Sequence, residues 1–327
     1  MFDKNTKIGR IVSQPEFQGY EYMTGKFPGI GGVFSGMLKL STMCRIVGTW
    51  NADSMADGMN YLLERAKAGK VFYDIYSEEE RQSDPGKRRT GIAAFPLEEK
   101  RPFVVVCAGG GYSSVCSMVE AYPVIRQLNL MGYAAFSMQY RCGKDAAAPN
   151  PMDDLAKAVQ FILEHAEELH VDPEGYAVMG FSAGGHLAAS FGTERLGWKH
   201  YGLPAPAALI LSYPVITMGE KTHPGSRKLL LEKNAQPAVQ EMYSIERQVT
   251  THYPPAYVWQ FDHDNLVPVE NSAMIAEALQ KQHIPCQYET FPGTIHGAGL
   301  GTGTACDGWL ERAAAFWASQ IERTNTT

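Results

Sequence analysis

The chain has 327 residues, of which 45% are hydrophobic and 20% are charged, and its formal net charge at pH 7 is -6. This length fits one large domain with an extension better than two equal domains. The negative charge argues against nucleic acid as a partner, because phosphate binding favours a basic surface.

The N-terminal part of the chain shows neither a signal peptide nor a clear membrane span. Residues 1–10 are polar and charged, without the apolar core of a secretory signal. Residues 27–47 are the only candidate for a membrane span, but they include Lys39, Arg45 and several glycines. A spanning helix needs about 20 nearly uncharged apolar residues. We therefore expect a cytoplasmic protein without membrane contact.

Residues 1–70 do not share the strand–helix alternation of the rest of the chain and are predicted to form a helical N-terminal extension. A helix is predicted over residues 54–68, where Met55, Met59 and Leu62 fall on one face. This face can pack on the core of the main domain. Alternatively, it can form an interface with a partner or with a second copy in a homo-oligomer. Both interpretations stay open.

Residues 71–327 alternate between short apolar strands and amphipathic helices. Residues 71–76 and 91–95 are predicted to form a hairpin, with Asp84-Pro85-Gly86 as its turn. Six further strands are predicted at 103–107, 133–139, 176–181, 207–211, 256–261 and 286–291. Helices are predicted up to residue 130, over 154–168, from 183 onward, over 269–282 and over 307–321. This order predicts an α/β fold with a mostly parallel sheet and helices on both faces.

One long connection interrupts this order, at residues 215–253. It is longer than the 2–6 residues usual between such elements, and long loops at the carboxyl edge of a sheet often shape binding sites. Its apolar residues include Leu229, Leu230 and Tyr243. We expect it to pack on the core as a small cap. The alternative is a structural crossover that does not contact substrate.

A candidate nucleophile follows the predicted strand at 176–181. That strand runs into Gly180-Phe181-Ser182-Ala183-Gly184, after which a helical pattern begins. Gly-x-Ser-x-Gly between a strand and a helix is the nucleophile elbow, in which a tight turn exposes the serine hydroxyl above the sheet. The helix N-terminus behind Ser182 also favours negative charge. His186, one turn into this helix, is expected to pack or to form a hydrogen bond.

A glycine run, Gly109-Gly110-Gly111, follows the predicted strand at 103–107. Bare backbone N–H groups at such a position can stabilise a developing oxyanion. The run resembles the His-Gly-Gly-Gly motif of lipases and esterases, although its leading His is Ala108 here. That resemblance implies Gly110, Gly111 and Ala183 as oxyanion-hole donors. A plain tight turn is the alternative.

A serine nucleophile needs a general base, and the base needs a carboxylate that orients it. His296 follows the last predicted strand, and Asp264 follows the strand before it, within Asp264-Asn265-Leu266-Val267-Pro268. Asp264 is preferred to Asp262 because it occupies the Asp-x-x-Val-Pro pattern. Asp262-His263-Asp264 could also be considered as a metal site, but further ligands are absent nearby and none of the six cysteines forms a Cys-x-x-Cys pair.

These motifs occur in an order that resembles the esterase/lipase branch of the α/β-hydrolases, near bacterial acetyl-esterase-like and xylan-esterase-like proteins. The resemblance also includes Tyr140-Arg141 and Tyr213-Pro214, and it covers residues 71–327. It implies an eight-stranded sheet and a triad of Ser182, Asp264 and His296. It does not fix the substrate, because this fold supports many reactions.

The resemblance implies a serine esterase that acts on a small-molecule, short-acyl ester through an acyl-enzyme, without a metal or organic cofactor. Two alternatives stay open. One is a peptidase of the same fold, which usually carries a larger cap than residues 215–253 provide. The other is an inactive binding module, which would not need all three triad side chains.

Overall fold

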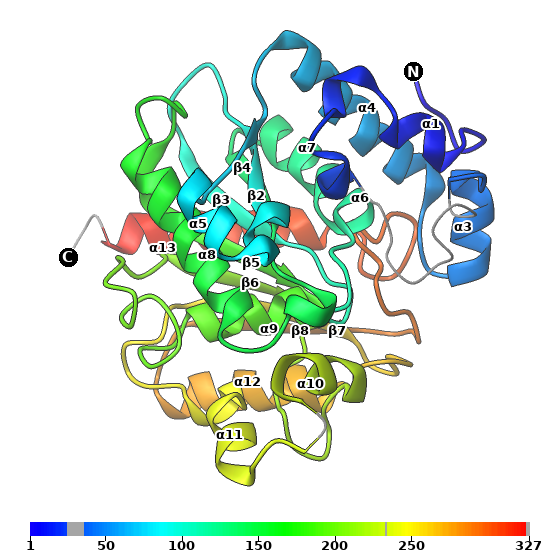
Figure 1. Ribbon diagram of the computed structural model, residues 1–327. Coiled ribbons are helices and arrows are strands. Elements are labelled where there is room, and N and C mark those ends of the chain that lie inside the picture. The colour runs from blue at the N-terminus through cyan, green and yellow to red at the C-terminus, as the bar shows by residue number, and fades with distance from the viewer. Residues whose placement is uncertain (25–35, 233, 325–327) are drawn as a thin grey trace.

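The computed structural model describes residues 1–24, 36–232 and 234–324 (Figure 1). Its centre is an eight-stranded sheet in the order β1-β2-β4-β3-β5-β6-β7-β8. The strands are β1 Phe72–Tyr73, β2 Gly91–Phe95, β3 Pro102–Cys107, β4 Ala134–Gln139, β5 Asp172–Phe181, β6 Ala208–Ser212, β7 Ala256–Phe261 and β8 Cys286–Phe291. The β1–β2 and β2–β4 pairs are antiparallel, and every other pair is parallel. The predicted mostly parallel, eight-stranded sheet is therefore confirmed.

Helices cover both faces of this sheet. In Figure 1, α8 and α9 cross the near face and α13 runs behind it. The helices of this part are α5 Glu78–Ser83, α6 Ser117–Glu120, α7 Tyr122–Leu130, α8 Asn150–Glu164, α9 Ser182–Phe191, α12 Glu270–Lys281 and α13 Trp309–Thr324, with 3-10 turns η3 Pro85–Arg89 and η4 Gly143–Asp145. Strands β2, β6 and β7 are buried along their whole length, because both faces of the sheet are covered.

Two tryptophans fix α13 against the back of the sheet. The Trp309 ring lies 5.8 Å from Phe181 and 5.1 Å from Trp259, which joins the helix to β5 and β7. The Trp309 indole N–H donates to the carbonyl of Gly299 at 3.1 Å, and that of Trp317 donates to Gly175 at 2.7 Å. Because a buried aromatic side chain contributes about 1.5–3 kcal/mol through burial alone, these contacts hold α13 and the loop before it in place.

The predicted hairpin over residues 71–95 is wrong in its connection. Strands β1 and β2 do pair, but helix α5 and turn η3 lie between them. Ser77 and Glu80 form a capping box: the Ser77 hydroxyl accepts from the Glu80 amide at 3.2 Å, and Glu80 accepts from the Ser77 amide at 2.8 Å. The Ser-x-x-Glu pattern is a helix-start signal, and here it overrides the turn chemistry of Asp84-Pro85-Gly86. Asp84 instead caps η3, accepting from the Gly86 amide at 2.9 Å.

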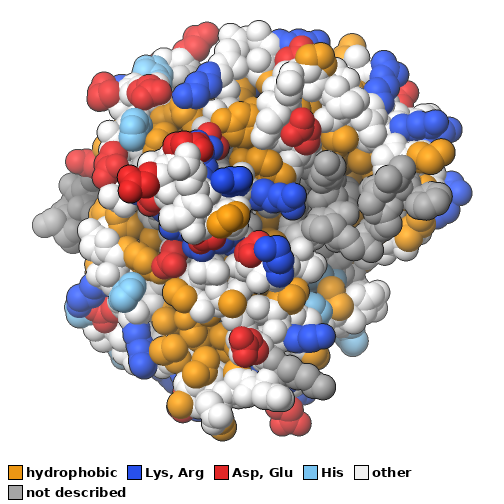
Figure 2. Space-filling model, viewed as in Figure 1, with side chains coloured by type: hydrophobic (Ala, Val, Ile, Leu, Met, Phe, Trp, Pro, Cys, Tyr) orange, Lys and Arg blue, Asp and Glu red, His pale blue; other side chains and the backbone are white. Residues whose placement is uncertain are grey.

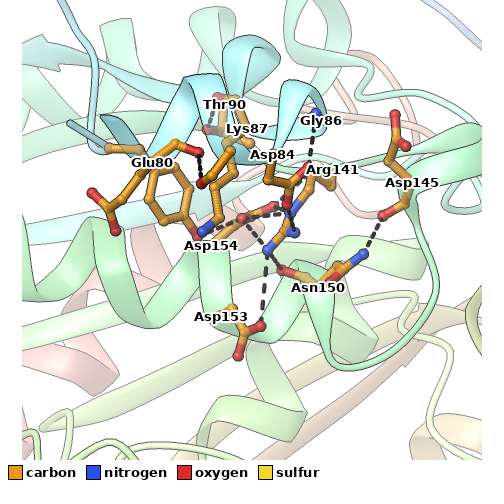
Figure 3. Close-up of polar contacts among 12 residues, drawn as sticks. Glu80, Asp84, Gly86, Lys87, Thr90, Arg141, Asp145, Asn150, Asp153 and Asp154 are labelled. Atoms are coloured by element: carbon orange, nitrogen blue, oxygen red, sulfur yellow. Dashed lines mark hydrogen bonds and ion pairs between the residues drawn. The ribbon is translucent and has the colours of Figure 1, made fainter. Parts of the chain in front are cut away.

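The buried Arg141 joins this segment to α8 (Figure 3). Its guanidinium forms an ion pair with Asp154 at 2.9 Å and with Asp84 at 3.0 Å, and the Asp154 side chain is fully buried. The Tyr76 hydroxyl donates to Asp154 at 2.7 Å. Removal of one partner from such a buried pair costs about 3–5 kcal/mol, because the remaining charge is left without compensation. We therefore assign Arg141 of the resemblance a structural role.

Several element boundaries differ by a few residues from the predicted ones. Helix α8 begins at Asn150 rather than at 154, because Pro151 in its first turn needs no amide partner there. Strand β5 begins at Asp172, four residues before its predicted start, where Pro102 and Asp172 are paired. Neither shift alters which residues lie at the carboxyl end of the strands.

The extension packs on the main domain through helix α4, beside α7 in Figure 1. Its elements are α1 Ile8–Val12, η1 Pro15–Phe17, η2 Glu21–Thr24, α3 Leu40–Val47 and α4 Ala52–Ala68. Met55, Met59 and Leu62 are buried, so the face predicted from their spacing packs within the chain. A Cβ added to Gly58 would lie 2.6 Å from the nitrogen of Pro123, so α4 and α7 approach closely there.

Residues 27–35, which are part of the segment considered as a membrane span, lie outside the described residues. Residues 40–47 of that segment form α3, whose Leu40, Met43 and Cys44 are buried. Within residues 1–24, 36–232 and 234–324, no helix combines the length and apolar character that crossing a bilayer requires.

The segment 215–253 contains two short helices and a 3-10 turn. These are α10 Pro224–Leu231, α11 Pro237–Met242 and η5 Ile245–Arg247. Leu230, Leu231 and Tyr243 are buried, and the carbonyl of Leu230 accepts from the Ala148 amide at 2.8 Å. The apolar residues of this segment therefore pack on the core, as its sequence leads us to expect. We refer to residues 215–253 below as the cap segment.

The surface carries charges of both signs. Figure 2 shows Lys and Arg side chains interspersed with Asp and Glu on the face that carries α8 and α10. This arrangement agrees with the near balance of 29 basic and 35 acidic residues in the sequence. Among the described residues on this face, neither sign forms a continuous block.

Candidate active site

Ser182 lies on the sharp turn where β5 meets α9. Its φ is +52°, in the left-handed region that serine rarely adopts. A Cβ on Gly184 would lie 2.1 Å from the carbonyl oxygen of Cys107, and a Cβ on Gly180 would lie 2.1 Å from that of Gly184. Only glycine fits at both positions, which explains the Gly-x-Ser-x-Gly pattern. The serine side chain is thereby held at the carboxyl end of the sheet.

Three side chains predicted from the sequence lie together at this point. The Nε2 atom of His296 is 2.8 Å from the Ser182 hydroxyl, and its Nδ1 atom is 2.7 Å from Asp264 Oδ2. The Asp264 side chain is fully buried and the His296 side chain is 9% exposed. A carboxylate can only accept, so Nδ1 carries the proton toward Asp264 and Nε2 accepts from Ser182.

The loop after β7 holds Asp264 in a network of donors. Its Oδ1 atom accepts from the backbone amides of Leu266 and Val267, each at 2.9 Å. Its Oδ2 atom also accepts from the Gln260 side-chain amide at 3.1 Å. This arrangement explains the Asp-x-x-Val-Pro pattern, because the residues after the aspartate supply the amides that fix its carboxylate.

Asp262 does not approach the histidine of the triad. It faces solvent, where it lies 2.8 Å from His263 and accepts from the Gly293 amide at 2.9 Å. Within the described part of the chain, no group of three or more His, Cys, Asp or Glu side chains could hold a metal ion, this pair included.

The glycine run after β3 lies beside Ser182. Gly110 has φ +133° and Gly111 has φ +63°, so both adopt backbone conformations that side chains disfavour. The Gly109 amide donates to Glu120 at 2.6 Å. Among the described residues, the amides of Gly110 and Gly111 have no protein acceptor. They therefore remain available for an oxyanion, together with the amide of Ala183 at the N-terminus of α9.

Glu120, at the end of α6, connects this loop to the loop that carries His296. Its second oxygen accepts from the Tyr213 hydroxyl at 2.9 Å. That hydroxyl accepts in turn from the Gly299 amide at 3.0 Å, and the Tyr213 ring lies 5.0 Å from the His296 ring. Burial raises the pKa of the Glu120 carboxyl, while its hydrogen bonds and the nearby His296 act in the opposite direction.

His186 is buried behind the site and does not contact the cavity. Its Nε2 atom is 2.8 Å from the carbonyl of Tyr243, and its Nδ1 atom is 2.9 Å from the Tyr112 hydroxyl. The carbonyl can only accept, so Nε2 carries the proton and Nδ1 accepts from Tyr112. Burial lowers the pKa of His186 to about 4. The expectation of a packing and hydrogen-bonding role is confirmed.

The cavity above Ser182 has a volume of about 440 Å³. Its floor is formed by Ser182, His296 and the glycine loop. One wall comes from the extension, through Val47, Thr49 and Trp50, and the other from the cap segment, through His223, Gly225 and Leu229. The cap segment therefore lines the cavity, which goes against the interpretation of it as a crossover remote from the site.

A larger cavity, of about 820 Å³, lies at the opposite end of the strands. Its walls include the starts of β3, β5, β7 and β8, at residues such as Pro102, Asp172, Pro255 and Pro285. None of the triad residues reaches it. Ligands in parallel sheets bind at the carboxyl ends of the strands, so the smaller cavity is the better candidate site.

Comparisons with known proteins agree with this geometry. The family model described as BD-FAE matches residues 95–198, which include the glycine loop and Ser182. A solved structure of an acetyl ester-xyloside bifunctional hydrolase from Caldicellulosiruptor lactoaceticus matches with a TM-score of 0.67 and 29% identity, over 78% of this chain and 96% of that one. The chain is an esterase-like α/β-hydrolase.

Two curated relatives are similar to about two thirds of this chain. An endo-1,4-beta-xylanase B of Butyrivibrio fibrisolvens is 35% identical over 219 residues, which cover 64% of this chain and 34% of that protein. An acetylxylan esterase of Xylanibacter ruminicola is 31% identical over 225 residues, which cover 67% of this chain and 45% of that protein. The chain thus spans less than half the length of either relative.

Sequence reasoning missed several residues of this hydrolase's site. Glu120, Trp50 and His223 had no recognisable motif, because each reaches the cavity through packing of elements distant in the sequence. Tyr213 had a signal, since Tyr213-Pro214 was part of the resemblance, but its role as a hydrogen-bond bridge could not be inferred. Gln260 could have been suspected as a polar residue inside an otherwise apolar strand.

Proposed function

We propose that this α/β-hydrolase is a serine carboxylesterase that removes short acyl groups, acetyl above all, from carbohydrate esters. The observation that carries the proposal is the chain of hydrogen bonds from Ser182 through His296 to Asp264, at 2.8 and 2.7 Å. In this geometry a base can take the serine proton while a buried carboxylate stabilises the imidazolium that forms.

In the first half of the reaction, the Ser182 oxygen attacks the ester carbonyl carbon as its proton moves to His296 Nε2. The carbonyl oxygen becomes an oxyanion facing the amides of Gly110, Gly111 and Ala183. The carbon–alkoxide bond then breaks, and His296 returns the proton to the departing alcohol. An acyl-serine ester remains on the enzyme.

In the second half, His296 removes a proton from water as the water oxygen attacks the acyl carbon. The resulting tetrahedral intermediate collapses, the acid leaves, and Ser182 regains its proton from His296. Cys116, which also lines the cavity, does not compete as a nucleophile, because burial raises the pKa of its thiol to about 12. The thiol is therefore protonated at neutral pH.

The substrate class rests on two kinds of support. The similar proteins include one named acetylxylan esterase and one named acetyl ester-xyloside bifunctional hydrolase, so both names contain an acetyl ester and a xylose-based carbohydrate. The cavity, at about 440 Å³, also suits a small acyl group with a modest alcohol better than a long lipid.

Replacement of Ser182 tests the proposed function. Ser182→Ala should keep the fold and lower kcat on 4-nitrophenyl acetate by about three to six decades. A fluorophosphonate probe should label the wild type but not the variant. If the variant keeps more than a tenth of the activity, the serine assignment is wrong. Efficient cleavage of aminoacyl anilides with little ester hydrolysis would favour the peptidase alternative, and an unreactive wild type would favour a binding module.

A further inference from the structure

We propose that Thr49 and Trp50 of the extension form the binding surface for the alcohol part of the ester, and that this alcohol is a pyranose ring. The inference rests on the proposed esterase function and extends it to a region outside the part of the chain that the family model matches, residues 95–198. Its starting point is the position of each cavity wall relative to the reacting atoms.

The direction of proton transfer assigns one side of the cavity to the alcohol. His296 must return its proton to the departing alkoxide, so the alcohol lies against the imidazole. The carbonyl oxygen points the other way, toward the amides of Gly110 and Gly111. A residue beside the His296 loop therefore faces the alcohol, and a residue beside the glycine loop faces the carbonyl and acyl side.

Thr49 and Trp50 lie beside the His296 loop. A Cβ added to Gly297, the residue after His296, would lie 3.4 Å from the Trp50 Nε1 atom and 3.9 Å from the Thr49 hydroxyl. Both residues line the cavity that contains Ser182. Their position is fixed by helix α4, which begins two residues after Trp50 and whose N-cap, Asn51, accepts from the Ser54 amide at 3.0 Å.

The cap segment lies on the opposite side. A Cβ added to Gly111 would lie 3.5 Å from the His223 ring, so this ring covers the glycine loop. The His223 Nδ1 atom accepts from the Ser226 amide at 3.3 Å, which fixes the ring at the start of α10. His223 therefore borders the cavity at the glycine loop, whereas the side chains nearest to Gly297 include Trp50 and Thr49.

The chemistry of the alcohol side favours a neutral polyol. An indole offers a flat apolar face on which the C–H groups of a pyranose can pack. Thr49 and Asn265 add neutral groups that can donate and accept hydrogen bonds. Among the described residues that line the cavity, none is Lys or Arg, so an anionic alcohol would find no partner there.

The test compares two acetyl esters that differ only in the alcohol: ethyl acetate and a methyl β-xyloside carrying one acetyl group. Acetate release is measured for the full-length wild type and for Trp50→Ala. We expect kcat/KM for the xyloside to fall by about 10-fold or more, mainly through KM, because the loss removes binding that ground and transition states share. For ethyl acetate the change should stay within about threefold.

The controls separate this inference from the proposed function. If the wild type hydrolyses neither acetate, the esterase proposal itself fails. If it hydrolyses both and Trp50→Ala lowers the kcat/KM of neither or of both equally, the inferred alcohol-side surface is wrong.

A second variant covers the case in which Trp50→Ala does not fold. Trp50→Leu keeps apolar bulk without the flat ring, and the same selective loss is expected; an unchanged ratio between the two esters would overturn the inference. Leu229→Ala, which changes the cap-segment wall, should leave that ratio unchanged.

Discussion

The extension and the cap segment are far apart in the sequence, yet each provides one wall of the cavity above Ser182. The cap segment is inserted between β6 and β7 and borders the glycine loop through His223. The extension precedes the first strand and borders the His296 loop through Trp50. The difference suggests that recognition of the two halves of the ester is divided between two separate regions of the chain.

The two regions are also held in different ways. The cap segment is tied to the core by buried polar groups: Asn271 accepts from the amides of Ile216 and Thr217 at 2.9 and 3.1 Å, and His186 donates to Tyr243. The extension is held by the apolar face of α4 and by hydrogen bonds from Tyr61 to Asn129, from Arg65 to the Pro96 carbonyl and from Tyr122 to the Met23 carbonyl, and none of these bonds involves a histidine. Acid should therefore affect the attachment of the cap segment more than that of the extension.

The largest expected effect tests whether both walls serve one catalytic centre. Asp264→Asn should lower kcat by about four decades on every ester, because the amide cannot hold His296 in the tautomer that accepts from Ser182. Asp262→Asn should cost far less, since Asp262 faces solvent away from His296. Steady-state kinetics on ethyl acetate and on the acetylated xyloside would check this. The reverse order of the two variants would mean that Asp262 orients the histidine.

The next prediction concerns the acid sensitivity of the cap attachment. In the folded protein the pKa of His186 is about 4, against an ordinary value of about 6.5. The unfolded chain therefore binds the extra proton between these values, and the stability contributed by neutral His186 is present above about pH 6.5 and lost as pH falls toward 4. The loss amounts to about 3 kcal/mol. Urea unfolding measured across this range should show it.

The matched control for this titration is His186→Gln. Whatever its absolute stability, its unfolding free energy should depend less steeply on pH between 4 and 6.5 than that of the wild type, by up to about 1.4 kcal/mol per pH unit. Identical slopes for the two proteins would show that His186 is not the group responsible.

A smaller effect is expected at Glu120, which joins the two loops that the walls border. In Glu120→Gln an amide NH2 group replaces one carboxylate oxygen. This group cannot accept the hydrogen bond that the oxygen accepted, from either the Gly109 amide or the Tyr213 hydroxyl. Either change leaves a donor unpaired and removes a negative charge near His296. We expect kcat to fall about 10- to 100-fold on all esters alike. Glu289→Gln is the control, because Glu289 also accepts from a tyrosine hydroxyl, that of Tyr257, but lies away from the cavity.

The outcome at Glu120 distinguishes a positioning role from a general loss of stability. A positioning role predicts a kcat well below that of Glu289→Gln even where the two variants have similar melting temperatures. If the Glu120 variant loses activity on only one of the two acetates, Glu120 belongs to one wall rather than to the shared loops.

The smallest effect is expected at Leu229, on the cap side. The small cavity predicts that acetyl and propionyl esters are preferred to long acyl chains. Leu229→Ala should widen the acyl side and raise kcat/KM for butyryl relative to acetyl esters by about 3- to 10-fold. Val239→Ala, in the same segment but outside the cavity lining, is the control. A wild-type maximum at eight or more carbons would contradict the small acyl pocket.

The sequence identified the site through local patterns. The turn at Ser182, the glycine loop and the two loops that carry Asp264 and His296 each follow a strand of the parallel part of the sheet, so parallel pairing brings them to one edge. Their chemistry can be predicted because strand, turn and side chain are adjacent in the sequence.

The walls could not be predicted in this way. Trp50 reaches the cavity only because α4 packs on α7, and His223 only because α10 packs against Ala148. The spacing of Met55, Met59 and Leu62 predicts the buried face of α4, but these contacts join residues far apart in the chain, and no local pattern shows which element that face meets. The predicted hairpin over residues 71–95 failed for a different reason, since the prediction rested on the Asp84-Pro85-Gly86 turn alone, whereas a capping box at Ser77 and Glu80 starts a helix there.

The most direct test of the division between the walls is a double-variant cycle with Trp50→Ala and Leu229→Ala. Values of kcat/KM would be measured for acetyl and butyryl esters of both ethanol and methyl β-xyloside. The account predicts that the Trp50 change alters the ratio between alcohols, that the Leu229 change alters the ratio between acyl groups, and that the free-energy effects add within about 0.5 kcal/mol. Strong coupling between the two changes, or a Leu229 variant that alters the alcohol ratio, would contradict it.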